Sequence, residues 1–208
     1  MVRLTKIYTR TGDDGTTGLG DFSRTRKTDP RLAAYADVNE ANAAIGVAVA
    51  VERSRTGGGD LGPDVLAVLQ RVQNDLFDVG ADLCVPLKAE YEYPPLRVQA
   101  AWIEELEADC DRYNAEVPKL TSFILPGGTL TAAQLHVATT VVRRAERSAW
   151  RAVEEYGTGD IDGVNALTAT YLNRLSDLLF ILSRYANRAA GDVLWQPGGG
   201  RAEPPQRR

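Results

Sequence analysis

Hydrophobic residues recur at three- and four-residue intervals through most of the chain, which is the spacing of an amphipathic helix. Strand-like alternation is weak, except over residues 5–9, where a short extended piece fits. The helical stretches end at glycine, proline or capping residues and cover residues 31–55, 63–84, 97–116, 129–156 and 160–190. The pattern therefore predicts an all-α chain with five helices.

The expected helix starts carry recognisable signals. Asp29-Pro30 supplies an N-cap and a first-turn proline, and Pro63-Asp64 opens the second helix. Thr129 or Thr131 can cap the fourth helix and Asp160 the fifth. Helices of 20 to 30 residues are about 30–45 Å long. Because most connections are short, we expect antiparallel, up-and-down packing in a five-helix bundle with ferritin-like architecture.

Two segments lie outside the helical pattern. Residues 1–28 hold four glycines among Thr, Asp and basic residues, which predicts a loop that can become ordered. Residues 191–208 hold three consecutive glycines and three prolines, so we expect a mobile tail without a core of its own. The rest of the 208-residue chain, residues 29–190, is expected to form one domain.

Composition excludes several classes of protein. The 44% hydrophobic and 25% charged residues are ordinary for a globular chain, so disorder throughout is excluded. One His and two Cys cannot supply a multi-ligand Cys/His metal cage or a disulfide framework, and they indicate a reducing compartment. A net charge of −4 disfavours general nucleic-acid binding. No apolar run suits a membrane span or a signal peptide, so we expect a cytoplasmic protein.

The N-terminal loop carries the first candidate site. Its glycines let backbone N–H groups converge on an anion, its threonines add donors, and Arg10 and Lys27 add positive charge. This composition suits a polyphosphate, although the loop is not a Walker A motif because no Gly-Lys-Ser/Thr sequence follows. The alternative is a flexible loop with an Asp-Gly turn.

The fourth expected helix carries the second candidate site. Arg143 and Arg147 share a helix face, with Arg144 and Glu146 between them. Three guanidinium groups within five residues repel one another unless anions lie between them, and a triphosphate would meet that need. The alternative is a solvated helix face with an Arg–Glu pair.

Polar residues in the apolar fifth helix form the third candidate. Asn173 and Asp177 are four residues apart, and buried polar groups need partners. Asn173 could bind a ligand and Asp177 could orient an arginine; the alternative is a structural hydrogen bond between helices.

Single residues complete the candidates. Phe123 precedes a helix in Phe-Ile-Leu-Pro-Gly-Gly, where it is either functional or a hydrophobic staple or core plug. His136 has no Glu-x-x-His partner nearby, so we expect a packed or surface histidine and no protein metal site.

Four sequence blocks, taken together, point to a family. The chain resembles the PduO-type ATP:cob(I)alamin adenosyltransferases, also called corrinoid adenosyltransferases, over about residues 5–190. Four blocks in the same order are specific, whereas one alone would not be. The blocks are residues 6–13, 123–128, 143–147 and 171–177.

The resemblance implies a homotrimer with ATP and corrinoid bound between subunits. The family transfers the 5′-deoxyadenosyl group of ATP to cobalt and releases triphosphate, and the N-terminal loop is expected to order when ATP and Mg²⁺ bind. The implied ATP contacts are Thr9, Arg10, Thr11, Gly12, Thr17, Gly18, Lys27, Arg143, Arg144, Glu146, Arg147 and Asn173.

The resemblance also implies how catalysis works. Cobalt is the nucleophile, so the protein must align the reactants and neutralise the departing triphosphate, for which Arg143, Arg147 and Lys27 are the candidates. Phe123 matches the aromatic residue that displaces the lower cobalt ligand. The corrinoid and subunit-interface residues implied are Asn39, Phe123, Thr139 and Asp177.

Two positions depart from the family pattern. Family members commonly have Asp-Glu-Leu-Asn where this chain has Asn39-Glu40-Ala41-Asn42, and many have Arg where Thr139 stands. In the family that Asp and Arg pair across a subunit boundary. Losing only one would leave an unpaired buried charge, at a cost of about 3–5 kcal/mol. We therefore expect a neutral polar contact between Asn39 and Thr139 across the trimer.

Partners and alternatives follow from the same resemblance. An electron-donating reductase and a downstream adenosylcobalamin-dependent mutase are expected, and the tail could fold over the corrinoid through Trp195. One alternative function is a non-catalytic carrier of adenosylcobalamin. Another is a ferritin-like metal bundle, which the lack of Glu-x-x-His pairs disfavours.

Overall fold

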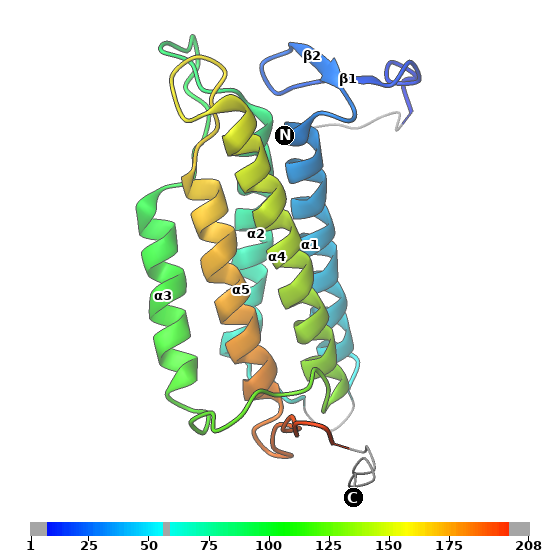
Figure 1. Cartoon of the computed structure of the whole chain (residues 1–208), viewed down its shortest axis with the longest axis vertical. Helices are drawn as coiled ribbons and strands as arrows, with labels where there is room; N and C mark the ends of the chain where they lie inside the picture. The colour runs from blue at the N-terminus through cyan, green and yellow to red at the C-terminus, as the bar shows by residue number, and fades with distance from the viewer. Residues whose placement is uncertain (1–7, 56–58, 200–208) are drawn as a thin grey trace, which may run out of the picture.

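The computed structural model describes residues 8–55 and 59–199 and confirms the expected five-helix, all-α fold within them. A short antiparallel hairpin precedes the helices, with β1 (Thr16–Gly18) paired to β2 (Arg24–Arg26). The helices lie side by side, with the hairpin at one end of the bundle and the described part of the tail at the other (Figure 1). They are α1 (Pro30–Arg53), α2 (Pro63–Cys84), α3 (Ala100–Asn114), α4 (Leu130–Tyr156) and α5 (Leu167–Ala186).

The core lies mainly where α1 packs on α4 and α4 on α5, while α2 covers α1 and α3 covers α5. Small side chains recur at seven-residue intervals on the two facing helices: Ala34, Ala41 and Ala48 on α1, and Ala138, Ala145 and Ala152 on α4. All six are fully buried. Because a methyl group keeps the helix axes close, α1 and α4 pack tightly along most of their length.

Capping residues fix the helix starts much as the sequence indicates. The Asp29 carboxylate accepts a hydrogen bond from the Arg31 backbone N–H at 2.8 Å, at the start of α1. Of the two candidate caps for α4, the structure selects Thr129, whose hydroxyl accepts from the Ala132 N–H at 3.2 Å. Thr131 instead donates to the buried Glu52 carboxylate at 2.8 Å.

The expected start of the fifth helix is wrong. Asp160 caps no helix, and α5 begins seven residues later at Leu167, whose backbone N–H donates to the Asn165 side chain at 3.1 Å. Residues before it pair instead with the chain after α2: Ile161 forms a bridge with Lys88, and Leu87 N–H donates to the Gly163 carbonyl at 2.9 Å. This long-range pairing keeps the segment out of the helix, so α5 starts later.

A buried carboxylate similarly shifts the start of α3 from the expected residue 97 to Ala100. Asp82, 1% exposed, accepts hydrogen bonds from the Arg97 guanidinium at 2.6 Å and from the Val98 N–H at 2.8 Å. Asn165 donates to the same carboxylate at 2.7 Å. The end of α2, the start of α3 and the start of α5 are thus joined through one side chain.

The two segments outside the bundle have more structure than the sequence suggests. The hairpin occupies part of the expected loop, whereas Thr9 lies in no strand and residues 5–7 of the expected extended piece lie outside the described residues. Of the expected mobile tail, residues 191–199 are described, and Leu194 forms a bridge with Ile124. None of the described helices is long and apolar enough to span a bilayer.

The expected helix caps Asp29 and Asp160 allow a direct test of stability. Asp29 accepts hydrogen bonds from the Thr25 hydroxyl at 2.6 Å and the Tyr156 hydroxyl at 2.7 Å as well as from Arg31. Asp29→Ala removes all three and is expected to lower the free energy of unfolding by about 2 kcal/mol. Asp160→Ala should change it by less than about 0.5 kcal/mol in the same urea titration.

The cost of Asp29→Ala should also depend on pH. Burial alone would raise the pKa of Asp29, but the hydrogen bonds from Thr25, Tyr156 and Arg31 outweigh it and hold the pKa below its usual value. The Asp29 contribution is therefore complete above the unfolded pKa of about 3.9 and is lost as the pH falls through the lowered folded pKa. A difference between wild type and variant that grew towards low pH would contradict this assignment.

Candidate functional site

Arg24 organises the N-terminal loop, although the sequence analysis did not single it out. Its guanidinium donates to the Thr11 carbonyl at 2.8 Å and to the Thr16 hydroxyl, and lies 3.7 Å from the Asp14 carboxylate. Asp14 in turn accepts from the Thr16 hydroxyl at 2.7 Å and backbone N–H at 3.0 Å, and these two bonds hold its pKa below the usual value. The loop is thus shaped before any ligand binds.

The predicted loop residues lie around this framework. The Thr9 and Thr11 hydroxyls are 2.9 Å apart, and Arg10 has a left-handed backbone conformation with φ of 62°. A methyl group added to Gly12 would lie 3.0 Å from the Lys27 Nζ, so the Lys27 ammonium lies directly over that glycine. Two hydroxyls and a cation therefore gather on one exposed loop.

Thr17 and Gly18 belong to strand β1, opposite Thr25 and Arg24 of β2. This register places Arg24 opposite Gly18, but no signal in the sequence marked it. Strands this short fall below the length at which alternation is informative.

The hairpin is fastened to the end of α2. The Gly20 N–H donates to the Cys84 carbonyl at 3.0 Å, and a Cβ at Gly20 would lie 2.5 Å from the Val85 side chain. Lys88 forms a 2.7 Å ion pair with Asp21. Although partial burial opposes ionisation, hydrogen bonds from Lys88 and Ser23 lower the pKa of Asp21 to about 2.

A second cluster joins the base of the hairpin to the end of α4. The buried Arg31 guanidinium donates to the Asp162 carbonyl at 2.6 Å and lies 4.7 Å from the Tyr156 ring centroid. Burial and the hydrogen bond to Asp29 raise the pKa of Tyr156 to about 12, so the phenol remains a donor. The loop thus has a rigid base on α1, α2 and α4.

The predicted residues of α4 divide between its two neighbours. The Arg143 Nε lies 3.5 Å from the Ser176 hydroxyl of α5, and Glu146 accepts a 3.0 Å hydrogen bond from the Asn173 amide. Arg144 turns towards α1, where it pairs with Glu40 and lies 3.6 Å from Asp37.

Arg147 differs from its neighbours. Its exposed guanidinium forms no salt bridge or hydrogen bond with any residue of the described ranges, and the same holds for the Lys27 ammonium. Cations without an internal partner are available to bind an anion.

Asp177 orients an arginine, as the sequence suggested, and that arginine is its neighbour in α5. Arg174 donates to Asp177 at 2.8 Å and to Glu107 of α3 at 3.0 Å. Beside them, burial raises the pKa of Cys110 to about 12, which keeps this thiol protonated and unreactive.

Asn39 and Thr139 do not meet within the chain. Asn39 is exposed on α1, whereas Thr139 is buried and its hydroxyl donates to the Leu135 carbonyl at 2.9 Å. Their contact across a subunit boundary stays a prediction about the assembled protein.

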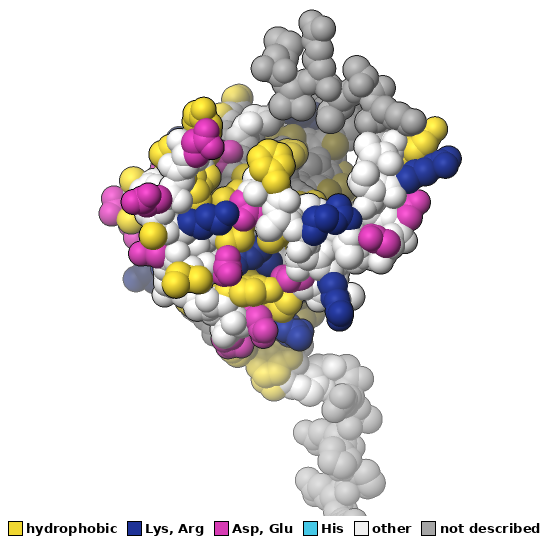
Figure 2. All heavy atoms as spheres, turned by 90° about the horizontal axis from the view of Figure 1, so that it is seen from above, with side chains coloured by type: hydrophobic (Ala, Val, Ile, Leu, Met, Phe, Trp, Pro, Cys, Tyr) yellow, Lys and Arg dark blue, Asp and Glu magenta, His cyan; other side chains and the backbone are white. Residues whose placement is uncertain are grey.

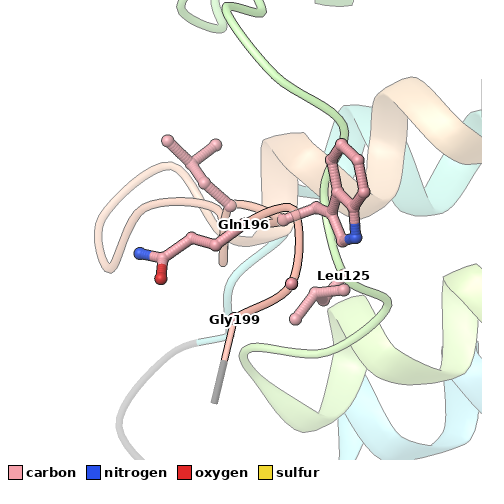
Figure 3. A pocket seen from close by; sticks show the side chains of 6 residues that line it. Leu125, Gln196 and Gly199 are labelled. Carbon is pink, nitrogen blue, oxygen red and sulfur yellow. The ribbon is translucent and has the colours of Figure 1, made fainter. Parts of the chain in front are cut away.

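Phe123 is neither a staple nor a core plug, because 78% of its surface is exposed. Its ring packs edge-to-face on Trp195, with centroids 5.9 Å apart. Next to this pair is a pocket of about 480 Å³ lined by Leu125, Leu194, Trp195, Gln196, Gly198 and Gly199. Leu125 enters it from the connector between α3 and α4, residues 115–129, while Gln196 and Gly199 enter from the tail (Figure 3).

Within one chain the predicted residues do not form one site. The connector that carries Phe123 and the hairpin lie at opposite ends of the bundle (Figure 1). At about 1.5 Å per residue, the helical run from Leu130 to Arg143 separates the start of α4 from its arginines by roughly 20 Å. No hydrogen bond or salt bridge between described residues joins the loop to residues 143–147 or to Asn173.

Charge does not gather on the hairpin end of the molecule. Seen from that end, Lys and Arg side chains are interspersed with acidic and hydrophobic ones (Figure 2).

His136 is buried, lies 3.4 Å from the Ser183 hydroxyl, and has its pKa lowered by burial. No group of three or more His, Cys, Asp or Glu in the described chain is arranged to hold a metal ion.

Residues 7–186 match the family model described as cobalamin adenosyltransferase. The chain is 59% identical to the corrinoid adenosyltransferase of Mycobacterium tuberculosis, over 96% of this chain and 97% of that one. It is 46% identical to the cobalamin adenosyltransferase of Cupriavidus metallidurans, over 93% and 96% of the two chains. A structure of a variant PduO-type ATP:corrinoid adenosyltransferase from Lactobacillus reuteri, complexed with cobalamin and ATP, superimposes with a TM-score of 0.79 at 36% identity, over 92% and 99% of the chains.

The docking of the hairpin can be tested with a matched pair of glycines. Gly20→Ala places a methyl group 2.5 Å from the Val85 side chain, whereas Gly18→Ala meets only the Ser23 carbonyl at 4.0 Å. The first substitution should detach the hairpin and speed amide exchange across residues 18–26 by about tenfold or more, as expected for overpacking. The second should leave exchange near that of wild type. Equal exchange in both variants would mean that Gly20 does not set the docking.

Proposed function

Since this chain belongs to the cobalamin adenosyltransferase family, we propose that it transfers the 5′-deoxyadenosyl group from ATP to the cobalt of cob(I)alamin, giving adenosylcobalamin and triphosphate. Among the residues implied to contact ATP, Lys27 on the loop and Arg147 on α4 carry the assignment, because their charged groups have no partner within the described residues. These two groups mark where the polyphosphate binds.

The reaction determines what the protein must provide. Cobalt attacks the C5′ carbon, the cobalt–carbon bond forms, and the carbon–oxygen bond breaks with its electron pair leaving on the triphosphate. No protein nucleophile or general base is required. The protein contributes alignment of the two substrates and stabilisation of the charge that develops on the leaving group.

The triphosphate is held by two surfaces. On the loop, Lys27 and the Thr9 and Thr11 hydroxyls supply donors, while Arg24 fixes the backbone that presents them. On the helices, Arg147 supplies an unpaired charge, and Arg143 makes only a long 3.5 Å contact that it can exchange for a phosphate. We expect Mg²⁺ to bind together with the phosphates of ATP.

The distribution of these residues supports a homotrimer with shared sites. The loop has no polar contact with residues 143–147 among the described residues, yet both carry groups suited to the same ligand. A neighbouring subunit can bring its α4–α5 surface to the loop without changing either fold. Each site is then completed by two copies of the chain.

Phe123 provides the apolar surface for the lower face of the corrinoid. Its ring packs edge-to-face on Trp195 and is otherwise largely exposed, so it is accessible to a ligand. A ring in that position excludes water and the lower base from cobalt, which makes Co(II) easier for the electron-donating reductase to reduce. Trp195 lies beside Phe123, so the tail would meet any corrinoid bound there.

Arg147→Gln tests the triphosphate site. It removes a charge that has no internal partner, so the fold should be unaffected while kcat for adenosylation falls by about 100-fold. Arg151→Gln, one turn further along α4 and equally exposed, is the control and should remain within about twofold of wild type. Similar losses in both variants would show that general positive potential, not a specific contact, is responsible.

Phe123→Ala tests the corrinoid contact. It should slow adenosylation by about 100-fold, as expected when a group acting in the transition state is lost, while the Kd for ATP stays near wild type. Leu120→Ala, in the same connector and 46% exposed, is the matched control. Turnover by Phe123→Ala close to the wild-type value would remove the assigned role.

A further inference from the structure

We propose that Arg184 and Asp192 are positioning residues for Phe123, because their buried ion pair fastens both the connector and the tail to the last turn of α5. The inference rests on the proposed function, since the position of Phe123 matters to catalysis only if a corrinoid binds against it. It assigns a role to two residues that contact neither substrate.

Arg184 forms hydrogen bonds with the connector and the tail at once. Its guanidinium is buried; Nε donates to the Asp192 carboxylate at 2.8 Å, and Nη2 donates to the Pro118 carbonyl at 2.6 Å. Pro118 lies at the start of the connector and Asp192 at the start of the tail. Because the donors of a guanidinium are held in one plane, the two segments are fixed relative to each other as well as to α5.

Asn187, less than one turn further on, holds the other end of the connector. Its side-chain oxygen accepts from the Thr129 N–H at 2.9 Å, and its amide donates to the Gly127 carbonyl at 3.0 Å. Gly128 between them has a φ of 95°, and a Cβ there would come within 2.2 Å of the Asn187 amide group. The connector is therefore tied to α5 on both sides of Phe123.

The anchored tail in turn holds Phe123 itself. The Trp195 N–H donates to the Phe123 carbonyl at 2.8 Å, and the Leu125 N–H donates to the Val193 carbonyl at 2.8 Å. The Ser122 hydroxyl adds a 3.0 Å bond to the Trp195 carbonyl. This pairing places the Trp195 ring against the Phe123 ring and leaves Phe123 projecting from the surface.

The chemistry of this anchor, the Arg184–Asp192 ion pair, indicates that it positions the tail more than it stabilises the fold. The second Asp192 oxygen, Oδ1, is buried without a hydrogen-bond partner among the described residues, as is the nearby His136 Nε2. Apolar replacements for a buried ion pair often match its contribution to stability, whereas the pair defines geometry. An ion pair in this place therefore fixes where the tail pairs with the connector.

Releasing the tail is expected to change the coordination of cobalt. If the tail is released, the Phe123 ring loses its support and no longer occupies a fixed place beside the lower face of the corrinoid. The lower ligand then stays on cobalt, so bound cob(II)alamin remains five-coordinate and adenosylation slows. ATP binding is unaffected, because the loop and the α4 arginines lie elsewhere on the bundle.

The test compares Asp192→Asn and Arg184→Lys with Arg188→Lys in the full chain. Asp192→Asn removes the charge, and Arg184→Lys keeps it but loses the planar fork. Arg188, one turn beyond Arg184, donates to the Asp60 and Tyr185 carbonyls and forms no side-chain hydrogen bond with the described part of the connector or tail, so it is the matched control. Three quantities are measured: amide exchange at Leu125 and Trp195, the four-coordinate fraction of bound cob(II)alamin by electron paramagnetic resonance, and kcat with the Kd for ATP.

In the two anchor variants we expect exchange at both amides to rise by about tenfold, the four-coordinate fraction to fall, and kcat to fall by about tenfold with an unchanged Kd for ATP. The control should match wild type. If exchange rises in Asp192→Asn but the four-coordinate fraction does not change, the anchor is merely structural and the inference is wrong. Unchanged exchange overturns it as well.

Phe123→Ala, measured alongside, separates failure of this inference from failure of the proposed function. A low four-coordinate fraction in Phe123→Ala, with normal values in the anchor variants, overturns only the inference. Normal values in Phe123→Ala overturn the role of Phe123 itself. Should Arg184→Lys fail to fold, Asp192→Asn decides the question, because Asp192 lies outside the helices.

Discussion

The close packing of α1 against α4 is the constraint on which the rest of the molecule depends. Fully buried alanines at seven-residue intervals on both helices bring their axes together along most of their length. A 27-residue helix held in this way acts as a rigid rod of about 40 Å. It keeps the hairpin loop at one end, its own arginines near the middle and the Phe123 connector at the other end (Figure 1).

Ion pairs within the chain then determine which cations remain available to bind an anionic ligand. Carboxylates take up Arg24, Arg144, Arg174 and Arg184, so these side chains shape the loop, the helix contacts and the tail. Among the cations implied to contact ATP, Lys27 and Arg147 have no such partner within the described residues. Acidic neighbours thus determine which arginines hold parts of the fold together, and Arg147, without such a neighbour, is the one we propose to bind the triphosphate.

Sequence periodicity was sufficient for the helices because their packing follows local spacing. It failed where long-range contacts determine the structure: Ile161 and Gly163 pair with the chain after α2 and delay α5, and the tail pairs with the connector. The hairpin was missed because each strand has three residues. Four motif blocks identified the family, but the roles of Arg184 and Asn187 depend on connector groups 58 to 66 residues away in sequence. The role of Arg24 depends on the hairpin, whose short strands gave no signal.

We propose that two copies of the chain share each nucleotide site, one providing Lys27 and the other Arg147. Subunit complementation tests it most directly: Lys27→Gln and Arg147→Gln chains are co-expressed, and the mixed assemblies are assayed for adenosylcobalamin formation. Shared sites should give mixed assemblies that regain activity neither parent has, because some sites combine an intact loop with an intact α4. Mixed assemblies as inactive as both parents would contradict it, since the two halves would then have to come from the same chain.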